Sequence, residues 1–181
     1  MTGKHRYVAL IRGINVGGNS IIKMDKLKSL FESAGLTDIV TYIQSGNVLF
    51  STIQSDRSEI SKEIEEKLVP LTSKLVKVFV FSQPDLQKAA NNNPFACKNG
   101  NGELVCHLMF MSDEPEAAKI EALTRLQGEE YRFHVTGNVL YYSYLKQYAG
   151  NRQTINFEKI LGVTGTSRTW KVVDKLIELL N

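Results

Sequence analysis

The chain has too few cysteines to be held together by disulfides. Its 181 residues include two, Cys97 and Cys106, whereas secreted domains that depend on disulfides are dense in cysteine. We therefore expect a reducing compartment, the cytoplasm. Histidine is also scarce: the three present have no metal-ligand spacing, and the adjacent Cys106 and His107 would point to opposite faces of a strand. We expect no metal site.

Long apolar runs are missing as well. Runs such as Val8–Ile11 and Val78–Phe81 fall far short of the ~18 residues of a membrane span. The N-terminus leads directly into a strand-like run without the layout of a signal peptide. Hydrophobic residues at 43% and charged residues at 23% are globular values, which exclude a disordered or fibrous protein. The composition predicts a folded protein with no membrane partner.

A strong excess of one charge is absent overall, because the formal net charge is +3. The basic residues nevertheless gather near the N-terminus, where the first 31 residues hold one acidic residue, Asp25, and six basic ones: Lys4, Arg6, Arg12, Lys23, Lys26 and Lys28. Such an excess attracts anions, although a solvated basic face is its commoner meaning. Nucleic-acid-binding domains typically have a pI above ~9, and the pI of 8.8 of this chain is lower.

Hydrophobic periodicity predicts the same order of elements twice. In the first half we expect strands at Tyr7–Ile11, Asp38–Gln44, Asn47–Thr52 and Leu75–Phe81, with helices at Met24–Ala34 and Asp56–Leu71, where Asp56 is the N-cap. Glu63, Glu65 and Glu66 would lie on the solvated side of that second helix. In the second half we expect strands at Leu104–Met111, Tyr131–Val135, Val139–Tyr144 and Gly165–Arg168, and helices at Asp113–Leu126, Gln153–Leu161 and Trp170–Leu180.

A short internal repeat supports the pairing of the halves. Ser45–Phe50 reads Ser-Gly-Asn-Val-Leu-Phe, and Thr136–Tyr141 reads Thr-Gly-Asn-Val-Leu-Tyr, at the same place in the order. The predicted fold is α+β: two ferredoxin-like βαββαβ halves related by duplication, with an extra C-terminal helix. The halves would be 1–82 and 104–181, joined by an Asn- and Gly-rich linker at 83–103.

The first half contains a loop, Arg12–Lys23, that the second half lacks. Its glycines have the Gly-x-x-x-x-Gly spacing of a Walker A loop, but Asn19 stands where the lysine should be and three residues precede the helix. A nucleotide triphosphatase signature therefore fails. What remains is a loop of backbone N–H groups between Arg12 and Lys23, which fits either an anion site or a plain flexible connection.

The chain resembles domain-of-unknown-function family 1697. The resemblance is carried by Arg12–Gly18 followed by Lys23 and Met24, by Tyr42–Val48, and by Thr166–Trp170. It implies a cytosolic bacterial protein with duplicated ferredoxin-like halves, and it implies no reaction. The family's last motif usually reads Thr-Arg-Asn-Trp, whereas Thr169 precedes Trp170 here. Threonine also caps helices, so a capping role survives the change, while a ligand role for an Asn amide is put in doubt.

Two functions remain open. The first is binding of an anionic, phosphorylated small molecule, with or without catalysis, and its candidate ligand residues are Arg12, Gly13, Asn15, Gly17, Gly18, Asn19, Lys23, Ser45, Gly46, Asn47 and Arg168. Arg168 is either one of these or a surface residue. The second is a single-stranded nucleic-acid or interaction module that uses the basic residues and the aromatics of 131–148. An apolar sheet face also suits a second subunit. No cofactor and no catalytic residue is assigned.

Overall fold

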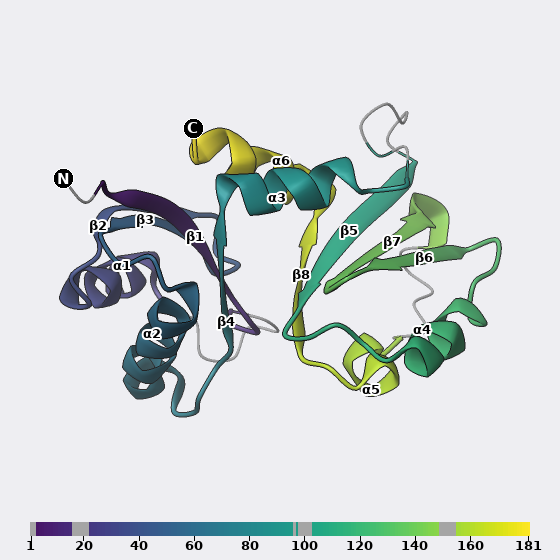
Figure 1. Ribbon diagram of the computed structural model, residues 1–181, viewed down its shortest axis with the longest axis horizontal. Coiled ribbons are helices and arrows are strands. Elements are labelled where there is room, and N and C mark those ends of the chain that lie inside the picture. The colour runs from purple at the N-terminus through teal and green to yellow at the C-terminus, as the bar shows by residue number, and fades with distance from the viewer. Residues whose placement is uncertain (1–2, 16–21, 96, 98–102, 149–154) are drawn as a thin grey trace. The chain divides into compact units, whose positions relative to one another are not determined.

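The computed structural model describes residues 3–15, 22–95, 97, 103–148 and 155–181. The chain forms two compact units (Figure 1). One consists of Met1–Gln87 with Leu176–Asn181, and the other of Lys88–Lys175. Each unit contains one four-stranded antiparallel sheet, and the two strand orders are equivalent. The α+β fold with duplicated ferredoxin-like halves is confirmed.

The first sheet has the order β2-β3-β1-β4. Its strands are β1 (His5–Ile11), β2 (Thr37–Tyr42), β3 (Asn47–Thr52) and β4 (Val78–Ser82), and the helices between them are α1 (Met24–Ser33) and α2 (Arg57–Thr72). Asp56 caps α2 as predicted, because its carboxylate accepts the N–H groups of Ser58 and Glu59. The helix ends at Ser73, whose φ of 56° is left-handed. The turn that follows delays β4 to Val78, three residues later than expected.

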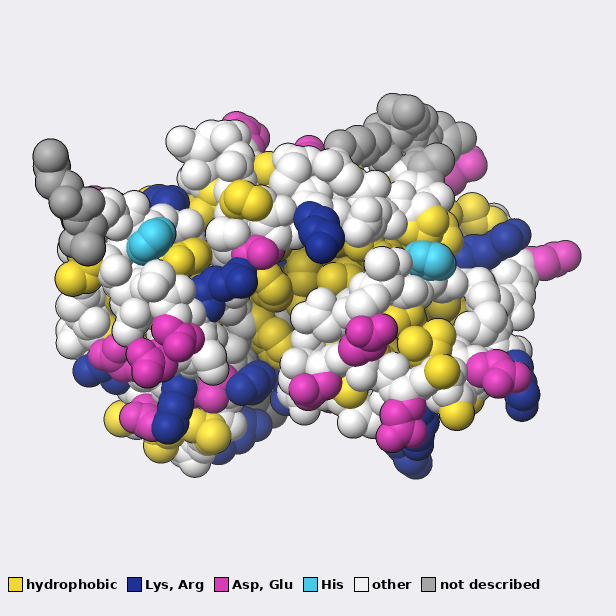
Figure 2. Space-filling view, viewed as in Figure 1, with side chains coloured by type: hydrophobic (Ala, Val, Ile, Leu, Met, Phe, Trp, Pro, Cys, Tyr) yellow, Lys and Arg dark blue, Asp and Glu magenta, His cyan; other side chains and the backbone are white. Residues whose placement is uncertain are grey.

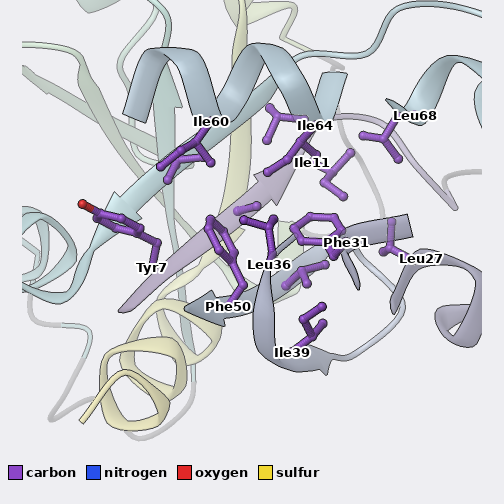
Figure 3. Packing of buried hydrophobic residues seen from close by; sticks show 14 of the residues in the cluster. Tyr7, Ile11, Leu27, Phe31, Leu36, Ile39, Phe50, Ile60, Ile64 and Leu68 are labelled. Carbon is purple, nitrogen blue, oxygen red and sulfur yellow. The ribbon is translucent and has the colours of Figure 1, made fainter. Parts of the chain in front are cut away.

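The core of this unit lies between the sheet and the two helices (Figure 3). Tyr7 and Phe50 from the central strands face Phe31 of α1 and Ile64 of α2, and all four are buried. Leu27 is also fully buried, whereas Leu30 is only partly buried. Alternation along the strands sends one set of side chains into this core. The packing fixes where β1 ends, at Ile11, and where the glycine-rich loop begins.

The second sheet has the order β6-β7-β5-β8. It contains β5 (Leu104–Met111), β6 (Tyr131–Thr136), β7 (Val139–Leu145) and β8 (Gly165–Thr169), and the helices α4 (Ala117–Thr124) and α5 (Phe157–Leu161) pack on one face. A short 3-10 helix, η1, spans Lys146–Tyr148. The two helices are shorter than predicted. The residue before a proline disfavours helical conformation, so α4 begins beyond Pro115. α5 begins after Asn156, whose side chain caps the helix by accepting the N–H of Lys159.

Two further helices complete the chain. A helix that we did not expect, α3 (Gln83–Asn91), occupies the first part of the segment 83–103. The last helix, α6, spans Trp170–Leu179. Thr169 accepts the N–H of Val172 at 3.4 Å and Trp170 is buried, as expected of a cap and a core residue. Arg168 is buried at 7% exposure, so the expectation of a surface residue is wrong.

The two cysteines are joined. Cys97 and Cys106 form a disulfide across a sequence separation of nine, a bond that the sequence analysis did not predict. The spacing of the two cysteines in the sequence does not reveal the bond, because only the folded chain brings their Cα atoms to 6.1 Å. Within the described part of the chain, no helix combines the length and apolarity needed to cross a membrane.

Candidate functional site

The glycine-rich loop is closed at its base by one side chain. The Asn15 amide donates to the carbonyl of Ile22 at 3.2 Å and to that of Gln44 at 2.9 Å, and its oxygen accepts the N–H of Ile22 at 2.7 Å. Asn15 has a φ of 57°, a left-handed conformation that asparagine tolerates better than most residues. The two ends of the loop are therefore held together, and both are held against the β2–β3 turn.

The β2–β3 turn packs against the base of the loop. Gly46 is buried with a φ of 75°, and its carbonyl accepts the N–H of Ile11 at 2.8 Å. A Cβ at this position would lie 2.9 Å from the Ile14 side chain, so only glycine fits without a shift. Asn47 is fully buried, and its amide donates to the Tyr42 carbonyl and to the Ser45 hydroxyl. Ser45, Gly46 and Asn47 thus shape the turn that supports the loop.

Basic residues surround this base. The N–H of Arg12 donates to the carbonyl of Lys77 at 2.9 Å, which joins the start of the loop to the start of β4. Lys23 follows the Asn15 clamp directly, at the N-cap of α1, and no side chain caps that helix. The backbone contacts therefore bring Arg12, Lys23 and Lys77 to the two ends of one loop. The uncapped N-terminus of α1 adds partial positive charge.

One carboxylate holds this arrangement in place. Glu65 of α2 is buried, and its Oε1 atom accepts the N–H of Val78 at 2.9 Å and pairs with the Lys77 ammonium at 3.2 Å. Our expectation that Glu65 lies on the solvated side of its helix is wrong, because the start of β4 passes over that side. Lys77 and Glu65 were not candidates from the sequence. A glutamate next to the apolar stripe residue Ile64 was the available signal.

The predicted site residues fall into three groups. Arg12, Gly13 and Lys23 lie at the ends of the loop, and Gly13 is exposed with a left-handed φ of 67°. Asn15, Ser45, Gly46 and Asn47 form the clamp and turn beneath it. Gly17, Gly18 and Asn19 lie outside the described residues. Arg168 belongs to the other unit, where its guanidinium donates to the Thr166 hydroxyl and to the Ser167 carbonyl, and burial lowers its pKa to about 10.

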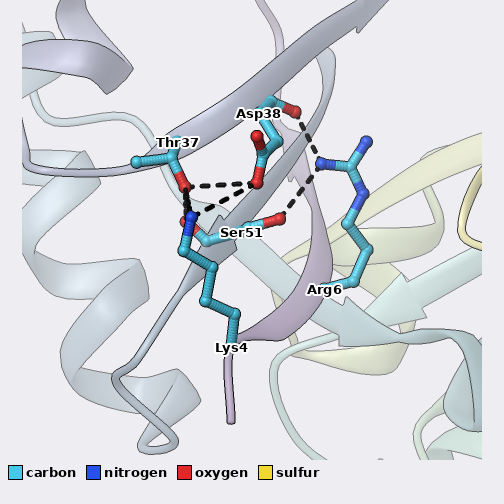
Figure 4. A network of polar contacts seen from close by, with 5 residues as sticks. All are labelled: Lys4, Arg6, Thr37, Asp38 and Ser51. Atoms are coloured by element: carbon cyan, nitrogen blue, oxygen red, sulfur yellow. Dashed lines mark hydrogen bonds and ion pairs between the residues drawn. The ribbon is translucent and has the colours of Figure 1, made fainter.

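Two of the six basic residues near the N-terminus, Lys4 and Arg6, bind to residues of the edge strand β2 (Figure 4). The pairing of β2 with β3 shifts near Asp38, which leaves its carbonyl to accept from the Arg6 guanidinium, and Arg6 also donates to the Ser51 hydroxyl. Lys4 pairs with the Asp38 carboxylate at 3.7 Å. The hydrogen bond from Ser51 and the charge of Lys4 lower the pKa of Asp38. Arg6 and Lys4 therefore stabilise an edge strand, and part of the basic excess is structural.

Four aromatic residues of the second unit, Phe133, Tyr141, Tyr142 and Tyr144, pack against neighbouring groups. Phe133 and Tyr144 are buried, and Tyr142 stacks on His107 with ring centroids 4.7 Å apart and lies 4.8 Å from the ring of Phe157. Tyr141, on the other face, is 1% exposed and donates to the Ala89 carbonyl. None of these rings forms an open stacking platform of the kind that binds single-stranded nucleic acid. In the described residues no three His, Cys, Asp or Glu side chains gather as a metal site would require.

Comparisons with known proteins agree with the fold. A family model described as "Protein of unknown function (DUF1697)" matches residues 4–141. A conserved bacterial protein from Streptococcus pneumoniae has a solved structure that matches with a TM-score of 0.76 and 20% identity, over 99% of this chain and 100% of that one. An unknown protein from Galdieria sulphuraria matches with a TM-score of 0.27 and 11% identity, over 92% and 99% of the two chains, which carries no argument. No curated protein matches the chain.

Proposed function

The chain belongs to the DUF1697 family of proteins of unknown function, and from its geometry we propose that it binds an anionic small molecule, in the simplest case a phosphorylated one, beside the base of the Arg12–Lys23 loop. One observation carries the proposal. The hydrogen bonds of Asn15 and the backbone bond between Arg12 and Lys77 bring three basic residues, Arg12, Lys23 and Lys77, to a single loop. The uncapped N-terminus of α1 lies at the same loop.

The chemistry of these groups suits a phosphate. The guanidinium of Arg12 presents parallel N–H donors that match two oxygens of one phosphate, and a lysine supplies a point charge. Gly13 is exposed and left-handed, and backbone N–H groups beside such residues form concave anion sites. Helix N-termini also favour phosphate. We assign Arg12 as the main charged partner, with Lys23 and Lys77 as secondary ones.

The remaining candidates take supporting roles in this proposal. Asn15 and Asn47 donate their amide N–H groups to backbone carbonyls of the protein. In this proposal they therefore stabilise the loop, and the neighbouring residues contact the ligand. Glu65 orients Lys77 and fixes the first N–H group of β4. Gly17, Gly18 and Asn19 stay predicted contributors of backbone N–H groups. The proposal concerns binding and assigns no reaction.

Calorimetric titration with inorganic phosphate, a nucleoside monophosphate and a sugar phosphate tests the proposal. Losing one charge-assisted hydrogen bond costs about 1.5–3 kcal/mol, so Arg12→Gln should weaken binding roughly ten- to a hundredfold. Lys62→Gln, which removes an exposed charge from the middle of α2, is the matched control and should bind normally. Equal affinity in both variants, or binding in neither variant nor parent, would contradict the proposal.

A further inference from the structure

A groove between α1 and α2 has the chemistry of a second, independent site. Its volume is about 570 Å³, and Leu30 of α1 and Pro70 and Leu71 of α2 supply its apolar surface. Leu30 and Leu71 are partly buried against the core of the first unit. Pockets of this size and apolarity are typical places for small organic ligands.

Aliphatic side chains are exposed near the end of α2. Val69 is 38% exposed, and Leu75, in the turn that follows α2, is 64% exposed. Figure 2 shows hydrophobic side chains at the surface over α2, with lysine, arginine and acidic side chains beside them. The apolar walls of the groove offer a flexible hydrocarbon chain a place out of water.

Charge on the rim selects the sign of the ligand. Lys26 lines the groove from α1 and Lys67 lines it from α2, whereas Asp25 is the one acidic residue in the lining. Among the residues that the structure describes, neither lysine makes an ion pair or a side-chain hydrogen bond. The groove therefore combines apolar walls with a net positive rim.

We propose that this groove binds an amphiphilic monoanion, an alkyl carboxylate, with its chain along Leu30, Pro70 and Leu71 and its head between Lys26 and Lys67. The apolar walls supply most of the affinity, since each buried methylene contributes regardless of the head group. The two lysines supply the preference for a carboxylate over a neutral head. Neither property depends on the phosphate site proposed above, because Arg12 does not line the groove.

A homologous series of ligands tests the apolar part. Hexanoate, octanoate, decanoate and dodecanoate are titrated against the full chain while backbone amide resonances are followed by NMR. Each methylene that enters the groove should strengthen binding by up to about fourfold, which is ~0.8 kcal/mol per methylene converted with RT. The shifted resonances should come from Asp25–Ser33 and Lys67–Leu71. Affinity that does not rise with chain length, or shifts confined to the other unit, would overturn the proposal.

The ratio of decanoate to decanol affinity tests the charged part, because it is insensitive to small losses of stability. We expect the parent to prefer decanoate about three- to tenfold, as exposed ion pairs allow. Lys26→Gln with Lys67→Gln should abolish the preference. Lys28→Gln with Lys62→Gln removes the same charge from the same helices outside the groove and should retain it.

Other outcomes of this experiment identify other occupants. Loss of the preference in both double variants would mean a general field effect and would overturn the assignment of Lys26 and Lys67. No binding of any alkyl ligand, together with concentration-dependent dimerisation in sedimentation, would show that a second copy covers the groove. Arg12→Gln should leave decanoate binding unchanged, so failure of the phosphate site and failure of this groove are distinguishable.

Discussion

Replacing Asn15 by alanine should lower the free energy of unfolding by about 2.5–5.5 kcal/mol. The side chain makes three hydrogen bonds of 2.7–3.2 Å, two with Ile22 and one with Gln44, and each contributes about 0.5–1.5 kcal/mol net. The φ of 57° at this residue adds about 1 kcal/mol for alanine, which has no side-chain contact to offset a left-handed backbone.

Three variants separate these contributions. Asn15→Gly loses the same hydrogen bonds but adopts the left-handed backbone freely, so it should cost less than Asn15→Ala. Asn15→Asp keeps an acceptor for the Ile22 N–H but turns a carboxylate oxygen toward two carbonyls, so it should restore little stability. Asn92→Ala, at an exposed turn, is the control and should stay within about 0.5 kcal/mol of the parent.

Urea denaturation followed by far-ultraviolet circular dichroism measures the change, and hydrogen exchange of the Ile22 amide locates it. That amide donates to Asn15, so it should exchange faster in Asn15→Ala than in the parent. If Asn15→Ala unfolds at the same urea concentration as Asn92→Ala, and the Ile22 amide stays protected, then Asn15 does not hold the loop closed and the clamp is refuted.

Three further changes probe other features. Gly46→Ala should lose about 1–3 kcal/mol in the same denaturation assay, because its φ is 75° and its Cβ would lie 2.9 Å from Ile14; a parent-like midpoint would contradict this. Burial raises the pKa of Tyr141 to about 12. Its stabilising contribution is therefore present below pH ~10 and is lost as pH rises through ~12, and Tyr141→Phe should remove one late-ionising tyrosine from the absorbance titration. Reducing the Cys97–Cys106 bond should cost about 2–3 kcal/mol for its short closed loop, whereas an unchanged melting curve with dithiothreitol would mean that the bond does not constrain the unfolded chain.

Local patterns were sufficient for much of the fold. β3 and β5 have the predicted bounds, Asn47–Thr52 and Leu104–Met111, because each is an uninterrupted run of strand-forming residues between turn signals. Asp56 could be recognised as a cap from the residues that follow it. α3 could not, since its stabilising contacts lie outside its own sequence and the Asn-rich stretch that follows it indicates a linker.

The sequence was sufficient to single out the loop of the candidate site, but not the contacts that hold its ends together. The glycines and flanking cations of Arg12–Lys23 mark a loop, and the structure keeps Arg12 and Lys23 at its ends. The role of Asn15 depends on partners 7 and 29 residues away, which no local pattern contains. Lys77 joins the site only because β1 pairs with β4. Such non-local pairing is decided by tertiary packing.

Titration of the isotope-labelled chain with inorganic phosphate, followed through its backbone amide resonances, tests the proposed anion site most directly. We expect saturable shifts at Gly13, Lys23 and Lys77, weakened by added salt because Lys23 and Lys77 are exposed charges. Gly137, in the equivalent turn of the second half, should not move, since that half has no corresponding loop. Shifts that spread evenly over lysines and arginines of both units, or that persist unchanged in Arg12→Gln, would contradict the account.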